Sequence, residues 1–385
     1  MAALVYPLTA QESDPSIRFS GEAKTGIYWT QQQYEGKDPT SEIKIHNNDD
    51  SGSNQGRFRV NLDYDNGNSR GFRVRIDWHQ WGDPYPDRWS YAFGYGNFFQ
   101  DQLAVSVGKL GASPWGTGGP EMWKELEWTE KQGGMRVEWK PSFLPEGHKI
   151  NTGFVLNYFN TDLDQGNPKA AEEVTLLEIL KESTVGIAYT NPLGHVRFAY
   201  RFDSDMDANQ ANKAGADVGF GEDEIVYRVE EHVLRNILPG LEIWALGHFM
   251  GVSAVNDEIK NYRNWFFIQY APEMFTAQIR LGYDYIKDRS ELSIKPSFYW
   301  NFFDKLISIG AAYMYKQDFG NRVWEGSPYL EMQVEPMVRI NWASSYIAFV
   351  YNWKQEYMGQ TWAEAGNKDP IMQTQFMNLR FVIYF

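Results

Sequence analysis

Apolar and polar side chains alternate residue by residue over long stretches of this chain. Between residues 57 and 65 the odd positions carry Arg, Asn or Asp, whereas the even positions carry Phe, Val, Leu and Tyr. The turn sequence Asn66-Gly67-Asn68-Ser69 follows, and the alternation continues over residues 72–79. An Asn-Gly turn between two such segments predicts a β-hairpin. Its charged face would meet bulk water in a soluble sandwich, or a water-filled lumen in a membrane barrel.

The same pattern, followed along the whole chain, predicts eighteen strands in a single domain over residues 13–385. Sixteen strands are an alternative, because strand boundaries inferred from a pattern shift by a few residues. No linker or change of composition divides the chain. The predicted strands are 16–29, 56–66, 70–80, 88–99, 101–110, 133–140, 149–160, 183–190, 194–203, 222–233, 239–251, 261–271, 274–286, 290–302, 305–316, 328–342, 345–356 and 373–385.

The connections between these strands alternate in length. Those after even-numbered strands are mostly short, as in 67–69 and 343–344, with 140–149 and 233–239 a little longer. Those after odd-numbered strands are mostly long and polar, and only 287–289 is short. Outer-membrane barrels have short turns at one end and long loops at the other, so the chain is predicted to be all-β, a transmembrane antiparallel β-barrel. The long loops are 30–55, 81–87, 111–132, 161–182 (with a short helix predicted over 169–181), 204–221, 252–260, 317–327 and 357–372.

Composition supports a membrane barrel. Aromatic residues make up 16% of the chain, yet its mean hydropathy is −0.52. No segment approaches the roughly 20 apolar residues that a membrane-spanning helix needs. The chain has no cysteine, which fits an oxidising envelope compartment. The net charge of −14 argues against nucleic acid as a partner. It fits either a cation-bridged bacterial surface with a cation-leaning pore, or solubility alone.

The last nine residues, Met377–Phe385, alternate with apolar residues at the odd positions and end on an aromatic residue. This ending, with the layout of the whole chain, resembles bacterial outer-membrane porins of sixteen or eighteen strands, whose final strand the assembly machinery reads. The resemblance implies an outer-membrane location, periplasmic termini and a water-filled pore for passive diffusion of small hydrophilic solutes and ions. Porins often trimerise, which leaves a homotrimer open. Residues 1–12 are interpreted as a signal-peptide remnant or a disordered N-terminus.

Charged side chains occupy every second position of the predicted strands, so they lie on one face of each strand and should line the pore. In general porins the third long loop folds into the lumen, and its acids face arginines on the wall. By that resemblance Glu121, Glu125 and Glu127 would face Arg57, Arg59, Arg73 and Arg75. Alternatively, these arginines only neutralise carboxylates of the wall. The other charged residues assigned to the inner face are Arg136, Arg197, Arg201, Arg228, Arg280, Arg339, Arg380, Asp63, Asp65, Asp77, Glu138, Glu230, Asp284, Glu331 and Glu335.

Two other functions remain open. Sugar-specific porins guide glycans along aromatic side chains, and the third loop offers Trp115, Trp123 and Trp128 for such contacts. A barrel enzyme is the weaker alternative, because the six histidines are scattered and no nucleophile or metal motif is present. The densest metal-capable group is Glu230-Glu231-His232, which an ordinary strand end also explains. No cofactor and no metal are expected.

Overall fold

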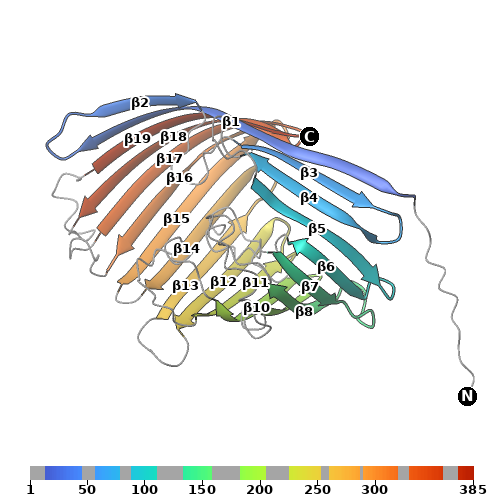
Figure 1. Cartoon of the computed structure of the whole chain (residues 1–385). Coiled ribbons are helices and arrows are strands. Elements are labelled where there is room, and N and C mark those ends of the chain that lie inside the picture. Colours follow the sequence, from blue (N-terminus) through green and yellow to red (C-terminus); the bar gives the residue numbers. More distant parts are fainter. Residues whose placement is uncertain are drawn as a thin grey trace, which may run out of the picture.

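The computed structural model describes residues 14–45, 57–78, 88–110, 133–157, 183–204, 225–252, 260–286, 289–319, 329–358 and 372–385. These residues form one antiparallel sheet of nineteen strands (Figure 1). The strands are β1 (Ser16–Tyr34), β2 (Thr40–Ile45), β3 (Arg57–Asp65), β4 (Arg70–Trp78), β5 (Arg88–Phe98), β6 (Leu103–Lys109), β7 (Gly133–Trp139), β8 (Lys149–Asn157), β9 (Thr184–Asn191), β10 (Gly194–Ser204), β11 (Ile225–Arg235), β12 (Leu241–Val252), β13 (Lys260–Tyr270), β14 (Phe275–Ile286), β15 (Arg289–Phe302), β16 (Ile307–Asp318), β17 (Tyr329–Trp342), β18 (Ser345–Met358) and β19 (Met372–Tyr384).

The sheet closes on itself as a barrel of eighteen strand positions. Apart from β2 and β3, strands that follow one another in sequence are paired, and β19 pairs with β1. Strands β2 and β3 share one position, because β1 pairs with β3 along its first half and with β2 along its second half. The predicted all-β class and the count of eighteen are confirmed. The prediction of a loop over 30–55 is wrong at Thr30–Tyr34 and at Thr40–Ile45, which are strand.

The two ends of the barrel differ in the length of chain that joins the strands. At one end, here named the turn end, the connections are 66–69, 99–102, 140–148, 192–193, 236–240, 271–274, 303–306 and 343–344. The opposite end is named the loop end. In the first turn Asp65 Oδ1 accepts a hydrogen bond from Gly67 N at 2.8 Å, and Gly67 adopts a φ of 85°. A residue without a Cβ suits that conformation, so the Asn-Gly sequence reverses the chain as predicted.

The pairing register fixes which side chains face the lumen. Glu22 of β1 is opposite Arg59 of β3, and Arg59 is opposite Asp77 of β4, so these three side chains share the inner face. The intervening positions, such as Phe58 and Phe72, are apolar and exposed on the outside. Followed round the barrel, this alternation places most charged side chains inside and apolar ones outside. A lipid-facing charge would cost about 2–4 kcal/mol at mid-bilayer, which explains the separation.

The register contradicts the predicted inner-face position of Glu230 and the strand parity predicted for Arg228. The register pairs Glu231, not Glu230, with inward-facing Arg197, so Glu230 faces outward. Because Glu230 and Glu231 are both acids, the sequence did not show which of them faces the lumen. In the structure Glu231 accepts a hydrogen bond from inward-facing His195. Arg228, opposite Tyr200 of β10, has the strand parity of Glu230, whereas Arg201 has that of Arg197. The side chains of both arginines lie outside the described part of the structure.

Aromatic side chains gather on the outer face near the turn end. Phe275 stacks on Phe298 with ring centroids 5.5 Å apart, and Trp300 lies 6.0 Å from Phe298. Trp300 and Trp342 lie near the ends of β15 and β17. Trp29 and Trp353 lie well inside β1 and β18. Tilted rings at this level are typical of the interfacial girdle of an outer-membrane barrel.

Among the described residues there is no α-helix, and hence none that is long and apolar enough to cross a membrane. The helix predicted over 169–181 lies outside the described residues, as do residues 1–12.

Candidate functional site

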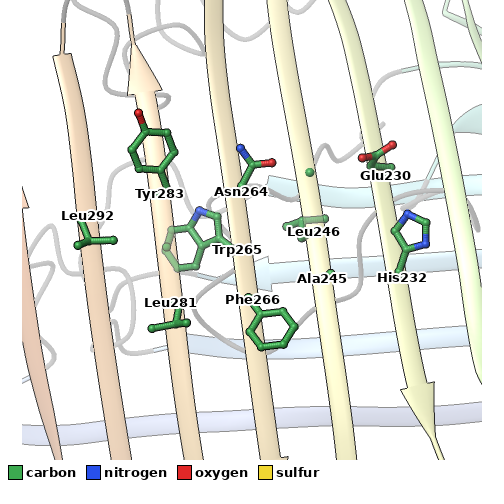
Figure 2. Close-up of a pocket in the computed structure, with 12 residues that line it drawn as sticks. Glu230, His232, Ala245, Leu246, Asn264, Trp265, Phe266, Leu281, Tyr283 and Leu292 are labelled. Carbon is green, nitrogen blue, oxygen red and sulfur yellow. The ribbon is translucent and has the colours of Figure 1, made fainter.

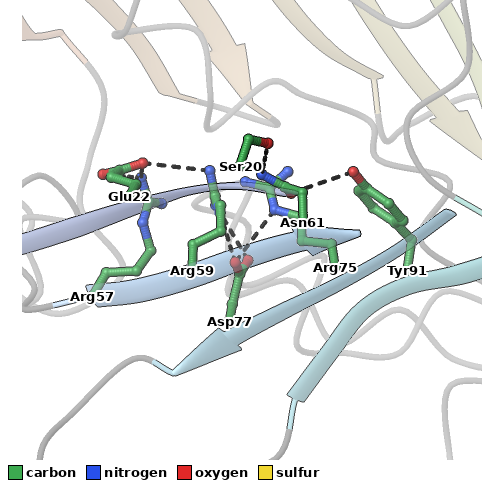
Figure 3. Close-up of polar contacts among 8 residues, drawn as sticks. All are labelled: Ser20, Glu22, Arg57, Arg59, Asn61, Arg75, Asp77 and Tyr91. Atoms are coloured by element: carbon green, nitrogen blue, oxygen red, sulfur yellow. Dashed lines mark hydrogen bonds and ion pairs between the residues drawn. The ribbon is translucent and has the colours of Figure 1, made fainter. Parts of the chain in front are cut away.

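The inner wall carries a network of ion pairs across three adjacent strand positions (Figure 3). Arg57 Nη2 donates to both carboxylate oxygens of Glu22 at 2.7 Å. Arg59 binds Asp77 through Nε at 2.6 Å and through Nη2 at 3.2 Å, and its Nη1 lies 3.6 Å from Glu22. Arg75 Nε donates to Asp77 Oδ1 at 3.3 Å. Three guanidinium groups are therefore held in place by two carboxylates.

The carboxylates of this network lie deep in the wall and the arginines lie closer to the lumen. The side chains of Glu22 and Asp77 are 8% and 5% exposed, whereas those of the three arginines are 19–23% exposed. Three positive and two negative charges leave a net charge of +1. A solute in the lumen therefore meets a basic surface, although most of its charge is compensated from behind.

Two tyrosines of β5 extend this surface. The guanidinium of Arg73 lies 5.3 Å from the ring centroid of Tyr95, and that of Arg75 lies 5.8 Å from Tyr91. Such distances are typical of cation–π contacts. The hydroxyl of Tyr95 donates to Asp65 Oδ2 at 2.9 Å, which orients its ring. Arg73 is half exposed, and its nearest carboxylate, Asp63, is 3.8 Å away. Of the four predicted arginines, Arg73 is the one most accessible from the lumen.

A second charged group follows on β7. Arg136 Nε lies 2.8 Å from Glu138 Oε1, and Lys140 Nζ lies 3.2 Å from Glu138 Oε2. Asn151 of β8 also donates to Glu138 Oε2, at 3.2 Å. The guanidinium of Arg136 lies over the ring of Phe93 at 5.8 Å. Here too a buried carboxylate organises cationic side chains on the inner face.

The chain that enters the third long loop begins inside the lumen. Leu110, which directly follows β6, is fully buried and belongs to one cluster with Phe93, Val155, Ala188 and Ala199. The register places these four partners on the inner face of β5, β8, β9 and β10. The side chain of Leu110 therefore packs on the lumen wall, at the point where residues 111–132 begin.

About half-way round the barrel from the arginines, the inner wall is apolar. Trp244, Leu246 and Phe267 form a buried cluster with Val233, and Trp265 packs against it. Next to it His195 Nε2 lies 2.6 Å from Glu231 Oε1, with Arg197 Nε 3.6 Å from the same oxygen. His195 is 7% exposed and Glu231 is fully buried. The His195 imidazole and the Glu231 carboxylate therefore offer little surface to a solute, whereas the side chain of Arg197 is 29% exposed.

The structure thus brings together the four predicted arginines Arg57, Arg59, Arg73 and Arg75 on β3 and β4, with side chains in the lumen. The predicted partners in the third loop, Glu121, Glu125 and Glu127, lie outside the described residues. The same holds for the predicted glycan contacts Trp115, Trp123 and Trp128.

Sequence reasoning missed Glu22, Tyr91 and Tyr95 of this surface. Polar residues at 18, 20, 22 and 24 show the alternation that would have placed Glu22 on the inner face. The tyrosines gave no such signal, because tyrosine is common on both faces of a barrel strand. The group Glu230-Glu231-His232 is split between the two faces of β11, and the described residues contain no set of three His, Cys, Asp or Glu side chains placed to bind a metal.

Comparison with known proteins identifies the fold. Neither a protein-family model nor a curated protein sequence matches the chain. Among solved structures, OccAB1 of Acinetobacter baumannii is similar with a TM-score of 0.52 at 11% identity, over 95% of this chain and 97% of that one. OprD of Pseudomonas aeruginosa gives 0.52 at 8% identity, over 98% of both chains. OccAB4 of Acinetobacter baumannii gives 0.51 at 9% identity, over 97% of this chain and 99% of that one. The chain has the fold of a porin-like outer-membrane β-barrel, as its resemblance to porins predicted.

Proposed function

We propose that this protein is an outer-membrane porin through which small hydrophilic solutes and ions diffuse passively. The observation that carries the proposal is a closed barrel of eighteen strand positions whose inner face bears ordered charges and whose outer face is apolar. An interior of this kind favours hydrated solutes, and opposed charges select among them by charge and size. No cofactor takes part, and the solute leaves unchanged.

The constriction is proposed to lie beside the arginines of β3 and β4. The position of Leu110 on the lumen wall supports a third loop that enters the pore. In that arrangement Glu121, Glu125 and Glu127 would face Arg57, Arg59, Arg73 and Arg75 across the opening. Arg73 is the favoured contact for a permeating anion, because its guanidinium is the least compensated of the four.

Reconstituted protein in planar bilayers tests this function. We expect ohmic single-channel conductance that persists without any ligand, and a reversal potential in a salt gradient that reports the wall charge. Replacing Arg73 by Gln should shift that reversal potential toward cation preference. Lys305, an exposed residue of a turn at the turn end, supplies the control Lys305→Gln with the same loss of charge away from the wall. Absence of conductance from correctly folded barrels would contradict the proposal.

A sugar-selective channel is the second candidate, and Tyr91 and Tyr95 favour it. Their rings lie beside cationic side chains on the inner wall, and sugar rings pack on aromatic faces. Saturable block of a small conductance by maltooligosaccharides, lost in Tyr95→Leu, would favour this function over general diffusion. A barrel enzyme stays the weakest alternative, since the imidazole of His195 and its partner Glu231 are buried in the wall.

We place the turn end of the barrel in the periplasm, with the start of β1 and the end of β19, and the loop end outside the cell. The natural absence of cysteine makes labelling a direct test. Lys37 lies between β1 and β2 at the loop end, and Asn68 lies in the first turn at the other end; both are exposed. In intact cells a membrane-impermeant maleimide should label Lys37→Cys and spare Asn68→Cys until the outer membrane is opened. The reverse result would invert the orientation.

A further inference from the structure

Five glutamines lie together on the outer face of the barrel, toward the loop end of the neighbouring strands β18, β19 and β1 (Figure 1). They form two rows across these strands: Gln33, Gln373 and Gln355 in the row nearer the loop end, and Gln31 and Gln375 in the next row. Ala23 of β1 is paired with outward-facing Phe58, and Gln31 lies an even number of residues further along the same strand, so the group faces outward. We name these five residues the glutamine patch. On the described strands the one other outward glutamine is Gln317, which is 1% exposed.

The glutamine patch begins where the apolar outer surface ends. The row below it, toward the turn end, contains Trp29, Met377 and Tyr351, and the row below that contains Ile27, Leu379 and Phe349. Ile27 and Phe349 are exposed, as side chains that contact acyl chains should be. Tryptophan and tyrosine on the outer face mark the level of the membrane interface. The glutamines therefore lie at the depth of lipid head groups.

Neighbouring tyrosines orient two of the amides. The hydroxyl of Tyr351 donates to Gln375 Oε1 at 3.2 Å, and the hydroxyl of Tyr357 donates to Gln355 Oε1 at 3.2 Å. Each of these amides keeps a nitrogen with two N–H donors. No described residue accepts a hydrogen bond from the side-chain nitrogen of any of the five glutamines. The glutamine patch thus offers donors, together with the amide oxygens of its other members, to a group outside the sheet.

This part of the outer face carries no charge. On the described strands β17, β18, β19, β1 and β2, every charged residue faces the lumen. Proteins bind phosphate most strongly through charged donors, and a bridging calcium ion would need carboxylates. The glutamine patch has neither, so it suits an uncharged group that both donates and accepts hydrogen bonds.

The outer face of β12–β14 has a different chemistry. The groove there is lined by Phe266, Leu281 and Leu292, and Asn264 is its single amide side chain (Figure 2). A concentration of amides at one depth is therefore a property of the wall formed by β18, β19 and β1.

We propose that the glutamine patch binds the sugar head group of a glycolipid, whose acyl chains lie on the apolar rows below. Sugar hydroxyls both donate and accept hydrogen bonds, as amides do. Sugar rings also pack on aromatic faces, and Trp353 stands in the same row as Gln31 and Gln375. Two rows on three strands cover about 10 Å by 7 Å, an area comparable with one sugar ring and its hydroxyls. The choice of the outer leaflet rests on the proposed function, which places the loop end outside the cell.

Binding of lipopolysaccharide to the full chain in detergent tests this site. The probe is a fluorescent lipopolysaccharide with a short sugar head group, and its anisotropy is measured in EDTA so that no metal ion can bridge phosphates to the protein. Gln31→Leu combined with Gln375→Leu should weaken binding about tenfold or more, because two amide groups are lost. Heat-modifiable migration on gels verifies that each barrel is folded.

Two variants serve as controls, and both should bind like the native chain. Gln32→Leu removes an amide at the same depth but on the inner face. Asn264→Leu removes an outward amide on another wall.

The remaining outcomes would overturn the proposal. Equal binding by the native chain and the double variant would show that the glutamines do not contact the lipid. Loss of native binding in EDTA would assign the contact to metal-bridged phosphates. Competition by phosphatidylglycerol as strong as that by unlabelled lipopolysaccharide would show that sugars are not recognised, and equal competition by the delipidated head group would assign the patch to a soluble sugar.

Conductance of the same preparation separates this site from the proposed function. A barrel that conducts but does not bind lipopolysaccharide refutes the glycolipid site alone. A barrel that binds it through the glutamine patch but does not conduct refutes passive diffusion alone.

Discussion

Replacing Asp77 by asparagine is expected to destabilise the barrel and to make its pore more anion-selective. The buried Asp77 carboxylate binds Arg59 through two hydrogen bonds and Arg75 through a third. Removing one partner of a buried ion pair costs about 3–5 kcal/mol. Both arginines reach the lumen and can recover water there, so we expect a loss of free energy of unfolding near the lower end, about 3 kcal/mol. Urea titration of the refolded barrel in detergent measures this loss.

The effect of the same substitution on ions follows from its charge. One unit of charge about 10 Å from an ion in water changes its energy by ~0.4 kcal/mol, about twofold in local concentration. Reversal potentials at low salt, where screening extends over ~30 Å, should therefore shift toward anions by about that factor. Arg59→Gln combined with Asp77→Asn restores the charge balance and should return the selectivity to that of the native chain.

Asp63→Asn is the matched control, since it also removes one inward carboxylate. Asp63 is well exposed and lies 3.8 Å from Arg73. An exposed pair contributes about 0–1 kcal/mol, so this variant should shift selectivity without a measurable loss of stability. If both variants unfold at the same urea concentration, the network on β1, β3 and β4 does not stabilise the wall. If neither shifts the reversal potential, the arginines do not face the permeation path.

The strands could be predicted from the sequence because each face of a barrel strand has its own solvent. Where alternation is unbroken, as in β3 and β4, the sequence predicted both the strand and its inner face. Strand β2 was missed because its six residues, Thr40–Ile45, lie within a long polar segment of the sequence; it pairs with Ile27–Gln32 of β1. The sequence did not predict correctly which residues of β11 face the lumen, because Glu230 and Glu231 are adjacent acids and either could have been assigned to the inner face.

The inner-wall network could be predicted only in part, because its bonds join different strands. Alternation places Arg57, Arg59 and Asp77 on one face, but it does not say which residues stand opposite one another. That register decides that Arg59 lies between Glu22 and Asp77 and can bind both. It also decides that Tyr91 and Tyr95 lie beside arginines. Side-chain parity is a local property of the sequence, whereas an ion-pair network is a property of the closed sheet.

The closing strand shows the same difference. Alternation over Met377–Phe385 predicted a strand with an apolar outer face, and β19 has such a face. The structure adds the partner: the backbone of Gly21 exchanges two hydrogen bonds with Phe385, at 2.8 and 3.2 Å. The ring of Phe385 crosses Gly21 and stacks on Phe58 of β3, with centroids 6.0 Å apart. Phe385 thus joins β19, β1 and β3 on the outside of the barrel.

We call the junction of β1 with β19 the seam of the barrel. Replacing Gly21 by alanine is therefore expected to disturb barrel closure more than the addition of a methyl group at any other position of this seam. A Cβ at this position would meet the ring of Phe385 and the carbonyl oxygen of Arg59, both closer than real Cβ atoms approach. The ring can turn aside, but the Arg59 carbonyl belongs to the backbone of β3 and can move only with that strand. Overpacking of this kind costs typically ~1–3 kcal/mol. The yield of heat-modifiable, folded barrel after refolding into detergent, and its urea midpoint, should both fall.

Gly94→Ala supplies the control, because the nearest atom to a Cβ at Gly94 is the Gly71 carbonyl oxygen at 3.8 Å. There the added methyl fits, and removal of a glycine from the unfolded chain stabilises by about 0.4–1 kcal/mol where the backbone permits it.

Phe385→Ala distinguishes the two clashes that a Cβ at Gly21 would make. If the ring alone opposes the methyl, adding Phe385→Ala to Gly21→Ala restores folding to the level of Phe385→Ala. If the Arg59 carbonyl opposes it, as the rigidity of a paired strand leads us to expect, the double variant refolds as poorly as Gly21→Ala. Refolding of Gly21→Ala at the native yield would show that the seam can open by the width of a methyl group, and closure would then rest on the hydrogen bonds between β1 and β19 alone.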